Sequence, residues 1–154
     1  MSGAGRPLRW LLHQYFRAAR GMTLGVRAAV IREGREVFLV RHTYVPGWHL
    51  PGGGVETGET LAVALAKELR EEACLRLTRP AALHGVFFNR AASPRDHVAV
   101  FVVRDFAVER VKRPDREIAE AGWFPLDALP EGVTAGTRRR LAEIVDGGAI
   151  DEDW

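Results

Sequence analysis

The clearest pattern along the chain is a series of apolar, β-branched runs separated by short polar turns. TLGVRAAVI (23–31) and EVFLVRHT (36–43) flank the turn REGR, and together they predict a β-hairpin. ALHGVFFN (82–89), HVAVFVVRDFAV (97–108) and EIAEAGWFPL (117–126) predict further strands. The chain is therefore expected to contain more strands than helices.

Two segments have a helical pattern instead. TLAVALAKELREEAC (60–74) is rich in alanine and leucine, and Thr60 is a suitable N-cap. TAGTRRRLAEIVDGG (134–148) predicts a closing helix with Gly147 near its end. The glycine- and proline-rich stretch 45–59 is expected to form a loop or very short strands. Hairpins combined with helices favour a mixed sheet with helices on its faces, of α/β or α+β character.

The beginning of the chain, residues 1–21, predicts an amphipathic helix that is rich in arginine and lacks acidic residues. Its apolar positions recur at helical spacing: Leu8, Leu11, Leu12 and Tyr15. An organelle transit peptide and a membrane-surface helix both have this pattern. The interpretation that we favour is a helix packed on its own domain, with Trp10 and Phe16 adding buried area.

Length and composition fit one globular domain that spans residues 1–154. The chain is 47% hydrophobic and 27% charged, and no stretch approaches the roughly 20 apolar residues of a membrane span. The one cysteine, Cys74, excludes an internal disulfide and suits a reducing, cytoplasmic location. A net charge of only +2 gives no special argument for a nucleic-acid partner. The acidic tail 147–154 is expected to be a solvated, partly ordered end of the chain.

Three glutamates are crowded into the stretch KELREEAC, residues 67–74. At about 100° per residue, Glu68, Glu71 and Glu72 share an arc of about 100° beside the apolar face of the predicted helix. A solvated charged face is one interpretation. The preceding loop GGGVETGE, with Glu56 and Glu59, favours another, because oxygen ligands that converge at a glycine-rich turn suit Mg²⁺ or Mn²⁺. A phosphate-binding P-loop is disfavoured, since it requires lysine where Glu59 stands.

From Gly53 to Leu75 the sequence resembles the Nudix box. Five residues separate Gly53 from Glu59, seven more precede Lys67-Glu68, and every acidic position of the pattern is present in register. Lys67 replaces an arginine and Cys74 replaces a glycine. Lysine keeps the charge but loses the bidentate fork. Cysteine at a left-handed helix end has to accept about 1 kcal/mol of strain, or the helix has to end differently.

The resemblance implies an α/β/α sandwich with a mixed sheet and Mg²⁺- or Mn²⁺-dependent hydrolysis of a phosphoanhydride in a nucleoside diphosphate linked to another group. It implies Glu68 and Glu72 as the main metal ligands, Glu71 in an assisting role through a ligand or a water, and the carbonyl of Gly52 as a further ligand. It also implies pairing of Glu59 with Lys67. A general base from outside the box is expected at Glu117, with Glu120 as the alternative.

The substrate is not specified by the box. Arg41 and Arg90 are candidates for holding phosphates, and Trp48, Tyr44 or Phe88 for stacking on a base; solvated arginines and core aromatics are the ordinary alternatives. The expected partner is a small nucleotide-type molecule, and the sequence is compatible with a homodimer. The alternative function is a Nudix-fold binding or regulatory module without catalysis, and the departures at Lys67 and Cys74 keep it open.

Overall fold

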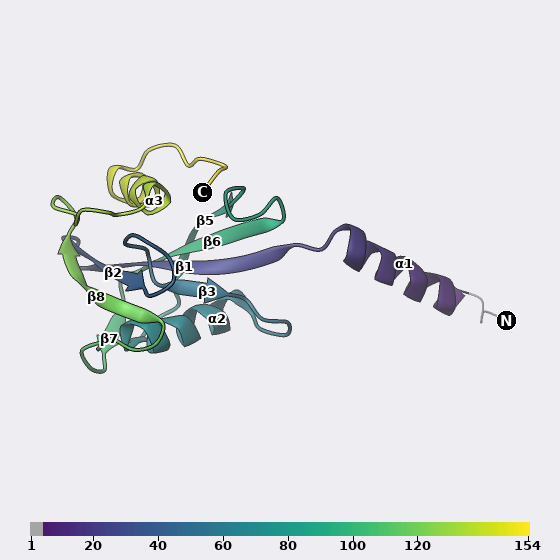
Figure 1. Ribbon diagram of the computed structural model, residues 1–154, viewed down its shortest axis with the longest axis horizontal. Helices are drawn as coiled ribbons and strands as arrows, with labels where there is room; N and C mark the ends of the chain where they lie inside the picture. The colour runs from purple at the N-terminus through teal and green to yellow at the C-terminus, as the bar shows by residue number, and fades with distance from the viewer. Residues whose placement is uncertain (1–4) are drawn as a thin grey trace.

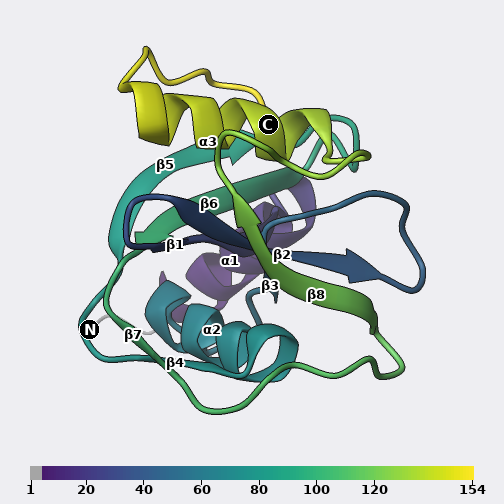
Figure 2. The same ribbon diagram turned by 90° about the vertical axis from the view of Figure 1, so that its left-hand side faces the viewer.

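The structure is a computed structural model that describes residues 5–154, and it arranges them as a mixed sheet between two helical layers (Figure 1). The elements follow in this order: α1 (Gly5–Ala19), β1 (Thr23–Arg32), β2 (Glu36–His42), β3 (Gly52–Gly54), α2 (Leu61–Glu68), a π-helical turn (Leu69–Ala73), β4 (Leu75–Leu77), β5 (Ala82–Phe88), β6 (Asp96–Val103), β7 (Phe106–Val108), β8 (Ile118–Pro125) and α3 (Ala135–Asp146). Figure 2 shows the sheet with α3 on one face and α2 on the other. The predicted α/β/α sandwich is confirmed.

The main sheet is built around β1. Its strands follow the order β5-β6-β1-β2-β8, β3 also pairs with β1, and only the β1–β6 pair is parallel. The first half of β1 pairs with β3 and its last two residues pair with β2, so the predicted hairpin is present. The division of β1 between two partners places the glycines of β3 beside α2.

Alternation along β1 divides the core into two clusters, because successive strand residues point to opposite faces. Val26, Ala28 and Val30 pack on the side of α2, together with Leu65 and Leu69. Ala29 packs on the other side, in a cluster that includes Phe87 of β5 and Leu141 of α3. Both faces of β1 are therefore buried, as its nearly continuous apolar run predicts.

Two predicted segments differ from the structure in detail. The expected strand 97–108 is divided into β6 and β7, and β7 leaves the main sheet to pair with the short strand β4. The helix expected from residue 60 ends its α-helical part at Glu68 and continues as the π-helical turn. Thr60 caps α2 as predicted, since its hydroxyl accepts a hydrogen bond from the amide of Val63 at 3.2 Å.

The N-terminal helix is present, but the expectation that it packs on its own domain is wrong. α1 projects away from the sandwich (Figure 1), and both Trp10 and Phe16 are exposed. The chain turns at Gly21, whose carbonyl accepts a hydrogen bond from Arg95 before β1 begins. None of the helices in residues 5–154 combines the length and apolarity needed to cross a membrane.

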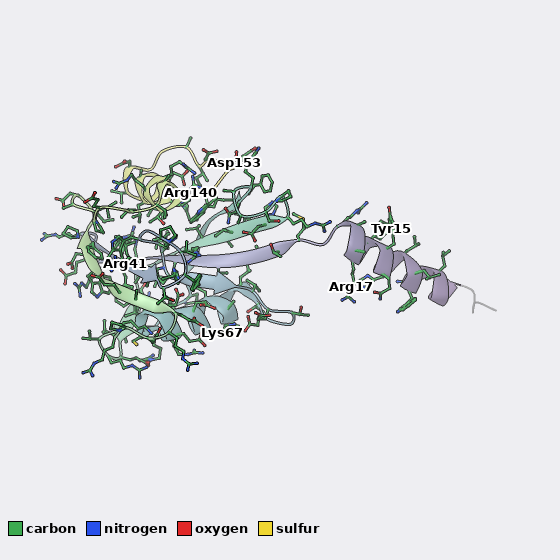
Figure 3. All side chains as sticks on the ribbon, in the orientation of Figure 1. Tyr15, Arg17, Arg41, Lys67, Arg140 and Asp153 are labelled. Atoms are coloured by element: carbon green, nitrogen blue, oxygen red, sulfur yellow. The ribbon has the colours of Figure 1, made fainter. Side chains whose placement is uncertain are left out.

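The acidic tail is largely exposed and partly ordered, as expected, but its end is tied to the domain. It returns to the domain, where backbone hydrogen bonds join Phe88 to Glu152 and to Trp154. The reason is the fully buried Arg140 of α3, which donates to the carbonyl of Asp153 at 2.7 Å and to Glu143 at 2.6 Å (Figure 3). A buried guanidinium requires such acceptors, and the tail supplies one of them.

The clamp between α3 and the tail yields a prediction about stability. Arg140→Ala is expected to lower the free energy of unfolding by about 3–5 kcal/mol, because it removes the buried partner of Glu143 and the cation that stacks on Phe87. The matched control is Arg138→Ala on the exposed face of the same helix, with a change within about 0.5 kcal/mol. Urea unfolding of both variants measures the difference, and equal values would show that the clamp contributes nothing.

Candidate active site

The glutamates are positioned by the change from α-helix to π-helix at the end of α2. Glu68 is the last residue of the α-helical part, and Glu71 and Glu72 lie in the π-helical turn. The turn ends at Cys74, which adopts the left-handed conformation (φ 54°, ψ 38°) and donates its amide to the carbonyl of Leu69. Cysteine therefore accepts the strained dihedral. π-helical turns are frequent at functional sites, and this one changes the arc calculated for a regular helix.

Glu72 is the most deeply placed of these glutamates, with only 4% of its surface exposed. One of its carboxylate oxygens accepts a hydrogen bond from Nε2 of His42 at 2.8 Å. The other accepts one from the amide of Gly52, also at 2.8 Å. These two hydrogen bonds fix Glu72 between β2 and β3.

Glu68 is half-buried beside Glu72, and its carboxylate makes no hydrogen bond to another residue in the range 5–154. Burial, followed by repulsion from Glu72 and Glu71, raises the pKa of Glu68 to about 7. The carboxylate lies against Gly53, where a Cβ atom would meet its Cδ at 2.7 Å. Gly53 therefore gives Glu68 the space that it occupies.

Glu71 and Glu117 face a common hollow. A cavity of about 300 Å³ is lined by these residues: Glu71, Glu72, Asp115, Arg116, Glu117 and Ile118. Glu117 is exposed and precedes β8 directly, so the structure brings it beside the glutamates of the π-helical turn. Lys112 donates to the backbone carbonyl of Glu71 at 2.7 Å and ties the loop 109–117 to that turn.

Glu59 and Lys67 form an ion pair at the entry to α2. Nζ of Lys67 lies 2.9 Å and 3.1 Å from the two carboxylate oxygens of Glu59. The hydrogen bond from Lys67 lowers the pKa of Glu59, and the same bond raises the pKa of Lys67. One Glu59 oxygen also accepts the amide of Glu56 at 3.0 Å, so the pair fastens the loop before α2 to the helix.

The carbonyl of Gly52, an expected metal ligand, accepts a hydrogen bond from an arginine of the protein. Arg27 of β1 donates from Nη1 to the carbonyl of Leu50 at 2.9 Å and to that of Gly52 at 3.3 Å. In residues 5–154 no group of three or more histidine, cysteine, aspartate or glutamate side chains is already arranged to hold a metal ion. Protein donors already engage both oxygens of Glu72, which leaves Glu68 and Glu71 as the carboxylates free to coordinate.

The residues nevertheless fit a hard divalent cation by their chemistry. All the donors are oxygens, and the carboxylates outnumber the cations that contact them. Glu68 is uncompensated in the folded protein, as its raised pKa shows. A divalent ion bound by Glu68 and Glu71 would offset the repulsion that the helix turn creates.

Three of the substrate-binding candidates lie apart from this cluster. Arg41 pairs with Glu120 at 2.6 Å on the solvent side of β2 and β8, and Trp48 is buried in the core below it. Arg90 pairs with Asp153 of the C-terminal tail at 3.0 Å. Figure 3 shows Asp153 beside α3 and Lys67 on the α2 side of the sheet. Arg90 is therefore held on the α3 side of the sheet, opposite the glutamate cluster.

Several residues of the site are missed by reasoning from the sequence. His42 and Arg27 come from strands that precede the box, and only folding brings them to Glu72 and Gly52. Tyr44, an aromatic candidate, lies 5.2 Å from His42 between ring centroids. A hollow of about 620 Å³ beside Glu71 is lined by Arg110, Lys112 and Arg113 among others. The sequence RVKRPDRE, with four basic residues in eight, is the signal that indicates this last feature.

The fold and the glutamate cluster together define the Nudix-like class of α/β/α sandwich that the sequence resembles. Residues 21–144 match the NUDIX domain, and this match covers most of the chain. The chain belongs to the NUDIX domain family, whose hydrolases generally use divalent metal ions.

Relatives within this family have different activities. The NAD-capped RNA hydrolase NudC of Pectobacterium atrosepticum is 33% identical over 116 residues, which cover 73% of this chain and 43% of that protein. The 8-oxo-dGDP phosphatase NUDT18 of Mus musculus is 31% identical over 146 residues, 92% of this chain and 42% of that protein. The chain thus spans less than half the length of these two relatives.

A solved structure supports the same fold at similar identity. The crystal structure of a MutT NUDIX hydrolase from Burkholderia pseudomallei has a TM-score of 0.68 and 33% identity, and the match covers 79% of this chain and 97% of that chain. This match shows that a solved member of the family shares the sandwich fold.

The Glu59–Lys67 pair leads to a prediction about activity. Lys67→Ala is expected to weaken turnover about 10–100-fold with little change in melting temperature, because the pair positions the loop and helix that carry the glutamates. Lys67→Arg should retain turnover, since the guanidinium can hold both oxygens of Glu59. Steady-state kinetics and thermal unfolding of both variants provide the measurement. Full activity in Lys67→Ala would remove the positioning role.

Proposed function

We propose that the protein is a metal-dependent pyrophosphohydrolase that cleaves a phosphoanhydride bond in a nucleoside diphosphate linked to another group. The observation that carries the proposal is Glu68. A half-buried carboxylate with two acidic neighbours and no protein donor weakens the fold unless a cation compensates it. The family match supports the same chemistry.

Glu68 and Glu71 would provide the direct ligands for Mg²⁺ or Mn²⁺, with Glu72 and the carbonyl of Gly52 completing the set after small rotations. When bound, such an ion neutralises phosphate charge and lowers the pKa of a coordinated water. His42 and the amide of Gly52 hold Glu72 in place, and Lys67 holds Glu59 at the entry to α2. These contacts keep the carboxylates in one orientation before substrate arrives.

The loop between β7 and β8 supplies the cations that an anionic substrate requires. Arg110, Lys112 and Arg113 line the hollow beside the π-helical turn. Lys112 is already engaged with Glu71 and Asp115, and Arg110 donates from Nε to Sγ of Cys74 at 3.3 Å. Of the three, Arg113 is therefore the side chain that can turn toward phosphate. NAD-capped RNA and 8-oxo-dGDP, the compounds in the relatives' names, both carry a diphosphate.

Glu117 is the proposed general base. It lies in the same hollow as Glu71 and is exposed, so it can accept a proton from water beside the phosphorus atom. Glu120 is already paired with Arg41 on the solvent side of the sheet. The register of β8 therefore supports Glu117 rather than Glu120.

The alternative is a ligand-binding module of the same family without catalysis. The replacements at Lys67 and Cys74 are the features that favour it. Lys67 contacts both oxygens of Glu59 as an arginine would, and Cys74 adopts the left-handed conformation that a glycine would adopt. Neither replacement disturbs a carboxylate, and this supports the enzyme. We place the enzyme in the cytoplasm, where the free thiol of Cys74 remains reduced.

The proposed function is tested by a panel of diphosphate compounds. NAD⁺, ADP-ribose and 8-oxo-dGDP are each incubated with the protein and Mg²⁺ or Mn²⁺, and the products are separated by chromatography. At least one compound should be cleaved at its phosphoanhydride, and EDTA should stop the reaction. Glu68→Gln should lower the rate of hydrolysis more than roughly 10–100-fold, the loss that is typical when a residue that only orients a metal ligand is changed. Metal binding without cleavage of any compound would favour the binding module.

The base assignment has its own prediction. Glu117→Gln should lower kcat about 10²–10⁴-fold with little change in KM, because a general base acts in the transition state. Glu120→Gln is the matched control two residues into β8, and it should cost much less, since it removes only a surface ion pair. The reverse order would assign the role to Glu120. Wild-type kcat in both variants would place the base among Glu68, Glu71 and Glu72.

A further inference from the structure

The helix α1 projects from the sandwich with its apolar side chains uncovered. The large apolar residues Leu8, Leu11, Leu12, Tyr15 and Phe16 are between 40% and 65% exposed. A helix of 15 residues is marginal in water when it has nothing to pack against. The uncovered residues therefore indicate that α1 has a partner outside the described chain.

The apolar and basic side chains of α1 lie on separate faces. At about 100° per residue, Leu11 and Phe16 bound an apolar arc of about 140°. The basic residues Arg9, His13, Arg17 and Arg20 occupy an adjoining arc of about 80°. Figure 3 shows Tyr15 and Arg17 on opposite sides of the helix. Trp10 lies outside the apolar arc, beside Arg17.

Charge decides what kind of partner this helix fits. No acidic residue lies between Gly5 and Arg32, so nothing along α1 offsets its arginines. Arg20 continues the helical hydrogen bonding to Phe16 and lies 4.5 Å above that ring, so a cation stands at the border of the apolar arc. An apolar face bordered by arginines is typical of a helix that lies in a membrane interface.

We propose that α1 is a membrane-surface anchor, which inserts its apolar face into the acyl boundary of an anionic bilayer while its arginines contact lipid phosphates. A helix of 15 residues is about 22 Å long, too short to cross about 30 Å of hydrocarbon, so it lies parallel to the surface. Arginine stems extend along the apolar boundary and place their guanidinium groups at headgroup level.

A second copy of this chain is the competing partner, and charge disfavours it. Pairing two copies of α1 through their apolar faces would bring together two sets of uncompensated arginines. An anionic surface satisfies both faces at once, because the acyl boundary covers the leucines and the headgroups neutralise the arginines. The cytoplasmic leaflet carries such anionic lipids.

The test is co-sedimentation of the full chain with vesicles of two compositions. One set is pure phosphatidylcholine, and the other is three parts phosphatidylcholine to one part phosphatidylglycerol. Each arginine near an anionic surface strengthens binding about fivefold, so Arg9, Arg17 and Arg20 together should give about 10²-fold tighter binding to the anionic set at low salt. High salt should remove most of this difference.

Variants on the same helix separate the two faces. The combined change Arg9→Gln, Arg17→Gln and Arg20→Gln should remove most of the preference for anionic vesicles, with Arg6 and His13 left in place. Leu12→Gln should weaken binding at least about 10-fold, because it places an amide in the apolar arc. Trp10→Gln is the matched control, since Trp10 lies outside that arc, and Arg138→Gln controls for an exposed arginine elsewhere.

Three outcomes would overturn the proposal. The first is no sedimentation with either vesicle set. The second is equal binding to neutral and anionic vesicles. The third is a dimer in solution that Leu12→Gln converts to a monomer while vesicle binding is absent, which would assign the apolar face to a second copy. None of these outcomes depends on catalysis, so the vesicle experiment tests the anchor separately from the proposed hydrolase activity.

Discussion

The repulsion among the carboxylates at the end of α2 is the constraint on which the rest of the site depends. The change to π-helical geometry turns Glu72 into the core, where His42 and the amide of Gly52 hold it. Glu68 is left half-buried with a pKa of about 7. The folded protein thus binds that proton more tightly than the unfolded chain, whose carboxyl titrates near 4.5, and stability falls as pH rises between these values. A cation that replaces the proton would remove this penalty.

The sheet and its helices could be predicted from the sequence because local patterns specify them. Apolar, β-branched runs identified β1 and β2, and Thr60 and Gly147 marked helix ends. The positions of the two terminal segments depend on contacts that local sequence patterns do not specify. The tail returns because Arg140, more than ten residues away, is buried and needs an acceptor. We expected α1 to pack on the domain, because an amphipathic helix usually buries its apolar face. Hydrophobic periodicity does not specify which surface buries that face.

The candidate site was predictable only as far as the box extends. The glutamates stood out in the sequence, and the resemblance to the box implied the Glu59–Lys67 pair, whose charged groups lie 2.9 Å apart in the structure. Spacing could not find His42 or Arg27, since their roles arise from how β1 and β2 approach β3. Arg41 and Arg90 were candidates for holding phosphates, and the structure pairs both with acids away from Glu68. Residues from distant strands are the part of a site that a single sequence does not reveal.

If the carboxylate cluster binds a divalent cation, substitutions at two neighbouring glycines should affect that binding differently. A Cβ at Gly53 would meet the Glu68 carboxylate at 2.7 Å, whereas a Cβ at Gly54 would meet nothing within 4 Å. Titration of Mn²⁺ followed by electron paramagnetic resonance gives the affinity without any substrate. We expect the native protein and Gly54→Ala to bind Mn²⁺ equally, and Gly53→Ala to bind it about 10–100-fold more weakly. Equal affinity in all three proteins, or no binding in the native one, would contradict this expectation.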